Sequence, residues 1–263
     1  DDAAGEIAKR AARDGGGRRL DVAEAAADAP GKPDAIAYEV VVDDAAYARW
    51  KEAIFAADLV CFDTETTSLD PMQARIVGLS FAVAEGRACY IPLAHRYAGA
   101  PDQLDRDRVL ADFAAWFADP SRAKLGQNVK YDQHVLANHG VTLAGVAHDT
   151  LLESYVLESH KLHDMDNLAW RHLNWKTIQY ADVAGKGAHQ IAFDQVPIER
   201  AGEYSGEDAD VTLRLHRHFH PAISADPKLA HIYGTLEMPV RDVLFRMERQ
   251  GVLIDADKLS AQG

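Results

Sequence analysis

The 263-residue chain is long enough to bury a substantial core, and its 48% hydrophobic and 26% charged residues are the composition of an ordinary globular protein. Its formal net charge of −13 argues against binding nucleic acid through a basic surface, unless acidic side chains hold divalent cations or a basic domain lies outside this chain. Cys61 and Cys89 lie in apolar, strand-like runs and neither a secretory leader nor an apolar run of about 18 residues is recognised, so we expect a reducing, cytoplasmic setting without membrane association.

The beginning of the chain has a different composition from the rest. It starts on Asp1 rather than Met and stops at Gly263 within a segment that reads as continuing, so we expect a piece of a longer polypeptide. Residues 1–36 are rich in Ala, Gly, Asp and Arg and show no sustained apolar face, which predicts a linker. Ordered structure is expected to begin near Tyr38.

Strand and helix patterns alternate after this linker. The spacing of apolar residues predicts, in chain order, a strand at 38–42, a helix at 45–57, a buried strand at 59–66, a hairpin formed by 75–84 and 88–94, a helix at 105–118 and a strand at 123–127. Strands first, with helices between and after them, indicate an α/β fold with a mixed sheet flanked by helices.

Helices dominate the second half of the sequence. Asn128, Asp149 and Asp164 are predicted N-caps for three helices, at 129–138, 150–158 and 165–173. A long helix is expected from about Ile198 to His220. The tail predicts an amphipathic helix at 235–251 and an extended segment at 252–255.

The first acidic motif, "LVCFDTETTSLD", lies at the end of the buried strand 59–66. Side chains alternate along a strand, so Asp63 and Glu65 share one face with Cys61, while Phe62 and Thr64 share the other. Acids at the end of a strand are also common as helix caps or turn residues. In isolation the motif therefore leaves both interpretations open.

The second motif, "GQNVKYDQHVLAN", places an acid in a helix. If Asn128 caps this helix, Asp132 lies about 60° from Val135 and about 40° from Leu136 around the axis, at the edge of the apolar face. An acid at this edge needs a partner, and a salt bridge with Lys130 is an alternative to a metal.

The third motif, "EYSGEDADVTLRLHRHF", contains several acids that a helical wheel separates. Tyr204 and Asp208 fall in a stripe about 80° wide with the apolar residues Val211, Leu215 and Phe219. The remaining acids, Glu203, Glu207 and Asp210, fall outside the stripe and are expected on the surface.

Four inward-facing acids would repel one another and be costly to bury unless they are neutralised. Carboxylate oxygens suit hard divalent cations. Two Mg²⁺ or Mn²⁺ ions about 4 Å apart would stabilise both the attacking and the leaving oxygen of phosphodiester cleavage. The predicted ligands of this site are Asp63, Glu65, Asp132 and Asp208.

The three motifs, read as "FDTETTSLD", "GQNVKYD" and "YSGEDADVTL", resemble those of the four-acid (DEDD) 3′–5′ exonuclease superfamily, and closely resemble the proofreading domain of the bacterial DNA polymerase I family. The resemblance extends through "HDTLLESYVL", "HDMDNLA" and "AGKGAHQIAFDQV". It implies a ribonuclease-H-like fold. It also implies a 3′–5′ exonuclease domain at 37–222, and a truncated start of the polymerase domain at 223–263.

The resemblance also implies roles for the acids and for a tyrosine. Asp63 would bridge two divalent cations, Mg²⁺ or Mn²⁺ with Zn²⁺ as a further possibility. Glu65 and Asp208 would complete the first site, and Asp132 would hold the second largely through water. Tyr204, four residues before Asp208, is typical of the tyrosine subtype and would orient the attacking water.

Further residues are similar to substrate-binding positions of the family: Leu69, Gln127, Asn128, Tyr131 and Tyr180. The resemblance implies removal of nucleotides from single-stranded or frayed DNA 3′ ends, within a bacterial protein whose polymerase domain is a partner. Thr67 replaces an acid found in well-known relatives and is not expected to matter, because that position holds no metal.

Three alternatives stay open from the sequence. An exoribonuclease of the ribonuclease D type shares the four acids and the tyrosine, although the polymerase-like tail counts against it. A non-catalytic module is also conceivable, since some polymerase I relatives keep the fold after losing the acids. Finally, His216 and His220 lie one helical turn apart and could bind zinc, but the sequence indicates no further ligands, so surface histidines are expected.

Overall fold

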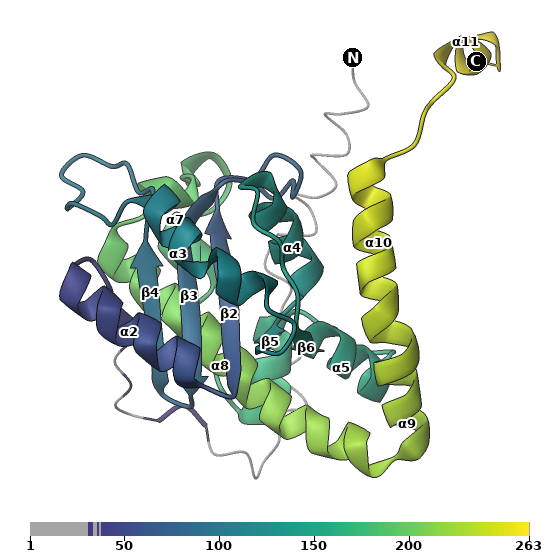
Figure 1. The fold of residues 1–263 in the computed structure, drawn as a ribbon, viewed down its shortest axis with the longest axis horizontal. Helices are drawn as coiled ribbons and strands as arrows, with labels where there is room; N and C mark the ends of the chain where they lie inside the picture. Colours follow the sequence, from purple (N-terminus) through teal and green to yellow (C-terminus); the bar gives the residue numbers. More distant parts are fainter. Residues whose placement is uncertain (1–30, 34–35, 37, 263) are drawn as a thin grey trace.

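The computed structural model describes residues 31–33, 36 and 38–262 (Figure 1). The described residues form a six-stranded sheet with the order β1-β4-β3-β2-β5-β6. Strand β2 pairs antiparallel with β3 and parallel with β5, which makes the sheet mixed, as predicted. The strands are β1 (Glu39–Val40), β2 (Leu59–Thr66), β3 (Ile76–Ala84), β4 (Arg87–Pro92), β5 (Ala123–Gly126) and β6 (Val146–Asp149).

Helices cover both faces of this sheet. Helices α2 (Asp44–Ala56) and α3 (Arg106–Ala118) pack on one face, where Phe62 and Phe81 of the sheet contact Phe117 of α3 with ring centroids 5.5 and 6.4 Å apart. The 28-residue helix α8 (Ile198–Ala225) crosses the other face. Figure 1 shows α8 behind the strands and α2 in front of them.

The alternation predicted for β2 is confirmed. Phe62 points toward α3, whereas Cys61 packs with Ala209 and Leu213 of α8. Because Asp63 and Glu65 follow Cys61 at two-residue intervals, their side chains also face α8. The sheet thus delivers the two acids of the first motif to the helix that carries the third.

Short helices join these layers. Helix α4 (Val129–Asn138) follows β5 and α5 (Thr150–Glu158) follows β6. The segment between α5 and α8 contains α6 (Met165–Leu168), a π-helical turn η1 (Ala169–Leu173), α7 (Tyr180–Ala184) and the 3₁₀ turns η2 (Gly187–His189) and η3 (Phe193–Gln195). Leu168, Leu173 and Trp175 pack against Val211, Leu215 and Phe219, so this segment covers α8 on the side away from the sheet.

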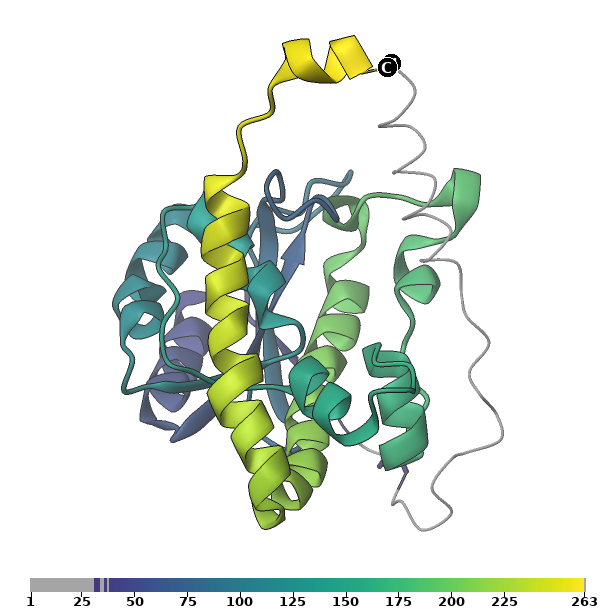
Figure 2. The same cartoon turned by 90° about the vertical axis from the view of Figure 1, so that its right-hand side faces the viewer.

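The tail forms α9 (Pro227–His231), a π-helical turn η4 (Ile232–Glu237), α10 (Met238–Gln250) and α11 (Ala256–Gln262). The predicted tail helix is confirmed, and Figure 2 shows α10 running along the outside of the domain. It lies on α4, where Glu248 pairs with Lys130 and accepts from His134 at 2.8 Å, and Arg249 donates to Asn138 at 2.7 Å. No helix among the described residues is long and apolar enough to cross a membrane.

One predicted cap was wrong. Asn128 has a left-handed backbone (φ 57°) and makes no side-chain capping bond. The carboxylate of Asp149 accepts instead from the backbone N–H groups of Asn128 at 3.0 Å and Val129 at 2.9 Å, while also capping α5 through Leu151 at 3.0 Å. Asp149 therefore caps both α4 and α5. Its cap on α4 joins residues about 20 positions apart in the chain, so it forms only when the two segments pack together.

The prediction of surface positions for Glu207 and Asp210 was also wrong, because both are fully buried. Glu207 accepts from Trp175 Nε1 at 3.0 Å and from Lys32 Nζ at 3.2 Å. Asp210 accepts from Tyr38 Oη at 3.0 Å and from the Gly86 N–H at 2.8 Å. Helix α8 is covered on several sides, so acids outside its apolar stripe are buried too; Glu203 is exposed, as expected.

The predicted linker 1–36 lies mostly outside the described residues. Within it, Lys32 pairs with Glu207 and its Nζ lies 5.6 Å from the centre of the Trp175 ring. Ile36 packs against the cluster that α8 forms with residues 168–175.

Candidate active site

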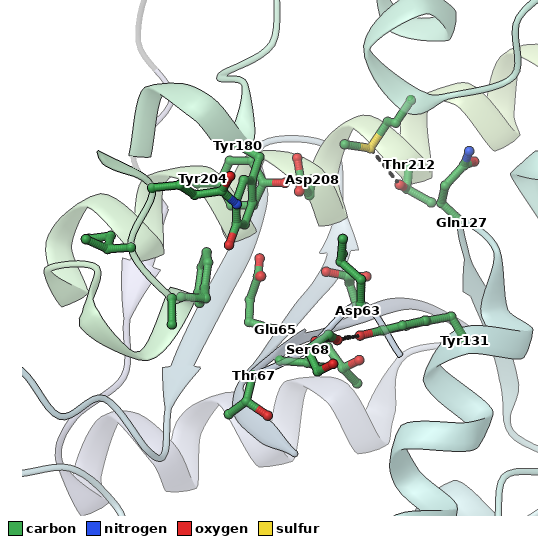
Figure 3. A pocket seen from close by; sticks show the side chains of 18 of the residues that line it. Asp63, Glu65, Thr67, Ser68, Gln127, Tyr131, Tyr180, Tyr204, Asp208 and Thr212 are labelled. Carbon is green, nitrogen blue, oxygen red and sulfur yellow. Dashed lines mark hydrogen bonds between the residues drawn. The ribbon is translucent and has the colours of Figure 1, made fainter. Parts of the chain in front are cut away.

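A cleft of about 640 Å³ opens where the end of β2 meets the middle of α8. The loop after β2 and the segment 187–193 complete its walls. Figure 3 shows Glu65 and Asp208 pointing into the same space, with Tyr204 and Tyr180 beside them. Acidic, hydroxyl-bearing and aromatic side chains therefore surround one opening.

Three carboxylates converge in this cleft. Asp63, Glu65 and Asp208 each offer an oxygen, and these oxygens lie within 4.8 Å of one another. Glu65 Oε1 accepts from the Ser205 hydroxyl at 2.7 Å. Asp208 Oδ1 is buried and has no hydrogen-bond partner among the described residues. A ligand that accepts electron pairs would satisfy this oxygen, and an all-oxygen donor set suits a hard divalent cation.

The electrostatics of the three carboxylates follow from their burial and closeness. Burial raises the pKa of Asp63 from 3.8 to about 6. Burial, and then the charge of Asp63, raise the pKa of Glu65 well above its ordinary value. Burial, together with Glu65 and Asp63, does the same to the pKa of Asp208. The group is thus unfavourable when fully ionised, and cations would relieve the repulsion.

Asp132 lies apart from this group. It is buried (2% exposed) on α4, as the helical wheel predicted, but its Oδ1 accepts from the Thr64 hydroxyl at 2.6 Å and from the Thr64 N–H at 3.1 Å. Its partner is therefore Thr64 rather than Lys130, which pairs with Glu248. Burial, followed by the charge of Asp63, raises the Asp132 pKa well above its usual range.

Tyr204 stands one helical turn before Asp208 and lines the cleft. Burial and the neighbouring charge of Asp208 raise the pKa of its hydroxyl well above 10.0, so the group keeps its proton. Its ring meets that of Tyr180 edge to face, with centroids 6.3 Å apart, and packs near Phe193 at 6.0 Å. This packing holds the hydroxyl beside the carboxylates as a hydrogen-bond donor.

Four of the five predicted substrate-binding residues line the cleft: Leu69, Gln127, Tyr131 and Tyr180. Leu69 is 83% exposed and Tyr180 is 37% exposed, so both apolar surfaces are available to a ligand. Tyr131 is fixed by its hydroxyl, which donates to the Ser68 carbonyl. Asn128 is the exception: it is exposed but does not line the cleft.

Sequence reasoning missed three neighbours of these side chains: Ser205, Thr64 and Phe193. Ser205 lies three residues before Asp208, on the same helix face, and that spacing could have indicated it. Thr64 could not be found in this way, because its bond to Asp132 joins a strand and a helix 68 residues apart. Phe193 stacks on Tyr180 from a 3₁₀ turn that has no periodic signal.

Comparisons with known proteins agree with this geometry. A family model described as 3′-5′ exonuclease matches residues 38–224. DNA polymerase I of Pseudomonas aeruginosa is 52% identical over 228 residues, covering 86% of this chain and 25% of the relative. DNA polymerase I of Rhizobium leguminosarum is 40% identical over 245 residues, covering 86% and 24%. The chain therefore spans about a quarter of the length of these relatives.

Solved structures show the same fold at low identity. The POL domain of Pol1 from M. smegmatis, in complex with DNA primer-template and dNTP, has a TM-score of 0.66 at 21% identity and covers 84% of this chain and 34% of that one. Brucella melitensis NrnC has a TM-score of 0.56 at 19% identity, covering 76% and 91%. With three acids grouped in an open cleft and a family match over most of its length, the chain belongs to the 3′–5′ exonuclease family found in DNA polymerase I.

Proposed function

We propose that this chain removes nucleotides one at a time from the 3′ end of single-stranded or frayed DNA by two-metal-ion hydrolysis. The convergence of Asp63, Glu65 and Asp208 at an open cleft beside a protonated tyrosine carries the proposal. Two divalent cations, Mg²⁺ or Mn²⁺ with Zn²⁺ as a third candidate, would supply Lewis-acid stabilisation of the charge that develops on the scissile phosphate.

Each acid has a separate part in holding these cations. Asp63 would contact both, Glu65 and Asp208 would complete the first site, and Asp132 would hold the second largely through water. The bond from Thr64 to Asp132 supports this division, since it keeps the fourth carboxylate apart from the other three. The Ser205 hydroxyl would fix the orientation of Glu65.

Tyr204 would orient the water that attacks phosphorus, by donating a hydrogen bond to it or to the phosphate. The bond from phosphorus to the 3′ oxygen of the preceding nucleotide then breaks, and a nucleoside monophosphate leaves. Leu69 would wedge against the terminal base, and Tyr180 would stack on an unpaired base. Gln127 and Tyr131 would lie along the substrate strand within the cleft, and Asn128 would contact that strand only where it extends beyond the cleft.

The proposal includes the polymerase domain as a partner within a longer chain. Helix α10 presents an exposed apolar stripe at helical spacing, formed by Val240, Val243, Leu244 and Met247. Such a stripe is suited to packing against a further domain. Because the surface of this chain is acidic, a basic polymerase domain would also strengthen DNA binding.

The test is degradation of a 5′-labelled single-stranded DNA with Mg²⁺ or Mn²⁺ by the wild-type chain, by Asp208→Asn and by Glu203→Gln. Glu203 is exposed on the same helix, which makes it a matched control. We expect products that shorten from the 3′ end, a loss of at least 100-fold in Asp208→Asn and no loss in Glu203→Gln, with EDTA abolishing the reaction.

Two outcomes would contradict the proposal. An RNA of the same sequence that is degraded faster than the DNA would favour the ribonuclease D alternative. Absence of cleavage by folded protein, both alone and after a polymerase domain is supplied, would favour a non-catalytic module.

A further inference from the structure

A second group of metal-ligand side chains lies outside the cleft. It consists of His148 at the end of β6, Glu153 in α5, and His216 and His220 one turn apart in α8. The expectation of surface histidines was wrong at His216, whose side chain is only 8% exposed. The ligands that the sequence did not indicate come from a strand and helix more than 60 residues earlier.

The three imidazoles converge on a single oxygen. Nδ1 atoms surround Oε1 of Glu153 at 2.8 Å from His216, 3.4 Å from His220 and 3.6 Å from His148. Around a tetrahedral zinc ion with bonds of about 2.0–2.1 Å, neighbouring ligand atoms are about 3.3 Å apart. The observed separations are close to this value, so a small shift of the rings would admit a cation.

Some buried polar atoms of this group lack a hydrogen-bond partner. Glu153 is fully buried, yet its Oε2 has no hydrogen-bond partner within the described part of the chain. Nδ1 of His220 is buried too, and its 3.4 Å contact with Oε1 lacks the alignment of a hydrogen bond. A buried polar atom without a partner destabilises the folded state. A cation bound by the carboxylate and the imidazoles would satisfy these atoms.

The basic side chain next to this group does not compete for its carboxylate. Arg217, which follows His216 in α8, pairs with Glu85 at 2.8 Å rather than with Glu153.

We infer that His148, Glu153, His216 and His220 form a structural site for a divalent transition-metal ion of the zinc class, separate from the catalytic cations. Imidazole nitrogen suits zinc and its neighbours, whereas an all-oxygen site suits Mg²⁺. His216 follows Asp208 by eight residues, which places the two sites about 12 Å apart along α8. The ion would tie the second half of α8 to β6 and α5.

The tail closes this site. Tyr233 of η4 stacks parallel to His148 with ring centroids 6.3 Å apart, and its hydroxyl lies 3.5 Å from Nδ1 of that histidine. The same hydroxyl accepts from the Asp149 N–H at 3.1 Å. A bound ion would therefore stabilise the start of the tail together with the end of α8.

The experiment is a Co²⁺ titration of the full chain carrying Asp63→Asn and Asp208→Asn, which remove the carboxylate site in the cleft. We expect one equivalent of Co²⁺ with the strong visible absorption of a tetrahedral nitrogen-containing site, displaced by Zn²⁺. His216→Gln and His220→Gln should each weaken this binding at least tenfold. His218→Gln, an exposed histidine on the same helix, is the matched control and should leave it unchanged.

Circular dichroism decides whether a variant is folded. His220 is 36% exposed, so His220→Gln keeps the test valid if the more buried His216→Gln does not fold. Co²⁺ binding that is absent, that shows only the weak absorption of octahedral oxygen ligands, or that is equally strong in folded His220→Gln would overturn the inference.

Discussion

At the scale of single residues, the candidate site depends on acids that are unfavourable where they stand. Asp63 and Asp208 are held close to Glu65 by a strand and a helix whose own packing is apolar. The apolar packing of this strand and helix thus offsets the electrostatic repulsion between the acids, and bound cations would reduce that repulsion. Replacing one of these acids by a neutral residue should therefore raise the free energy of unfolding but lower the exonuclease activity.

Asp63→Asn should stabilise the protein when cations are absent. The folded-state pKa of about 6 exceeds the ordinary 3.8, so the folded wild type binds its proton more tightly and loses stability as pH rises from about 4 through 6. Asparagine does not ionise, so the stability advantage of the variant should grow over that window to about 1–3 kcal/mol and stay level above pH 7. Urea unfolding of both proteins in EDTA from pH 4.5 to 7.5 measures this difference in stability. A difference that does not change with pH would show that ionisation of Asp63 is not its cause.

Tyr204→Phe should reduce exonuclease turnover by about 10–1000-fold while leaving cation binding intact, because it removes a donor and no ligand. The ring contacts with Tyr180 and Phe193 do not need the hydroxyl. Single-turnover cleavage and Mn²⁺ calorimetry separate the two effects. Loss of Mn²⁺ affinity would show instead that Tyr204 shapes the metal site.

At the scale of elements, the sequence was sufficient to predict which side chains share a face of β2 and which share the apolar stripe of α8. Each of these patterns depends only on the periodicity of side chains within one strand or one helix. The acids Asp63, Glu65 and Asp208 were therefore found from the sequence. Contacts between segments were not: a single-helix wheel cannot show that residues 168–175 cover α8, so Glu207 was misplaced. The partners of His216 were missed for the same reason.

Asp149 provides a test of cross-segment capping. Asp149→Ala removes the acceptor of three backbone N–H groups at the starts of α4 and α5 and should cost about 2–4 kcal/mol. Asp164→Ala, which removes one such bond at the start of α6, should cost about 1 kcal/mol. Chemical denaturation in EDTA compares the two variants. Equal losses of stability would mean that the bonds from Asn128 and Val129 to Asp149, at the start of α4, contribute little.

At the scale of the whole molecule, the tail is attached to the domain at two places, through Tyr233 at the end of β6 and through the contact of α10 with α4. Phe245 lies against the buried His134 with ring centroids 4.7 Å apart, near the ion pairs of Glu248. The opposite face of α10 is apolar and exposed. The helix is thus positioned between the exonuclease domain and whatever follows it in the longer chain that we propose.

Phe245→Ala should loosen α10 without affecting the cleft. Loss of the ring contact should make local opening easier by about 1–2 kcal/mol, which corresponds to roughly 5–30-fold faster amide exchange in α10. Met247→Ala, on the same helix but 61% exposed, should change exchange little. Hydrogen exchange measured by mass spectrometry checks both, and equal acceleration in the two variants would contradict the docking described here.

The alternation along β2 also restricts how this part of the gene can change length. Adding one residue before Phe62, or deleting Phe62, would turn both acids toward the aromatic cluster around Phe117. The insertion would bring Phe62 to the cleft face in place of Asp63, and the deletion would bring Thr64 there. Two residues added together would preserve the face but move the acids by one strand repeat relative to α8. Substitutions are therefore an easier evolutionary route to a modified site here than insertions or deletions.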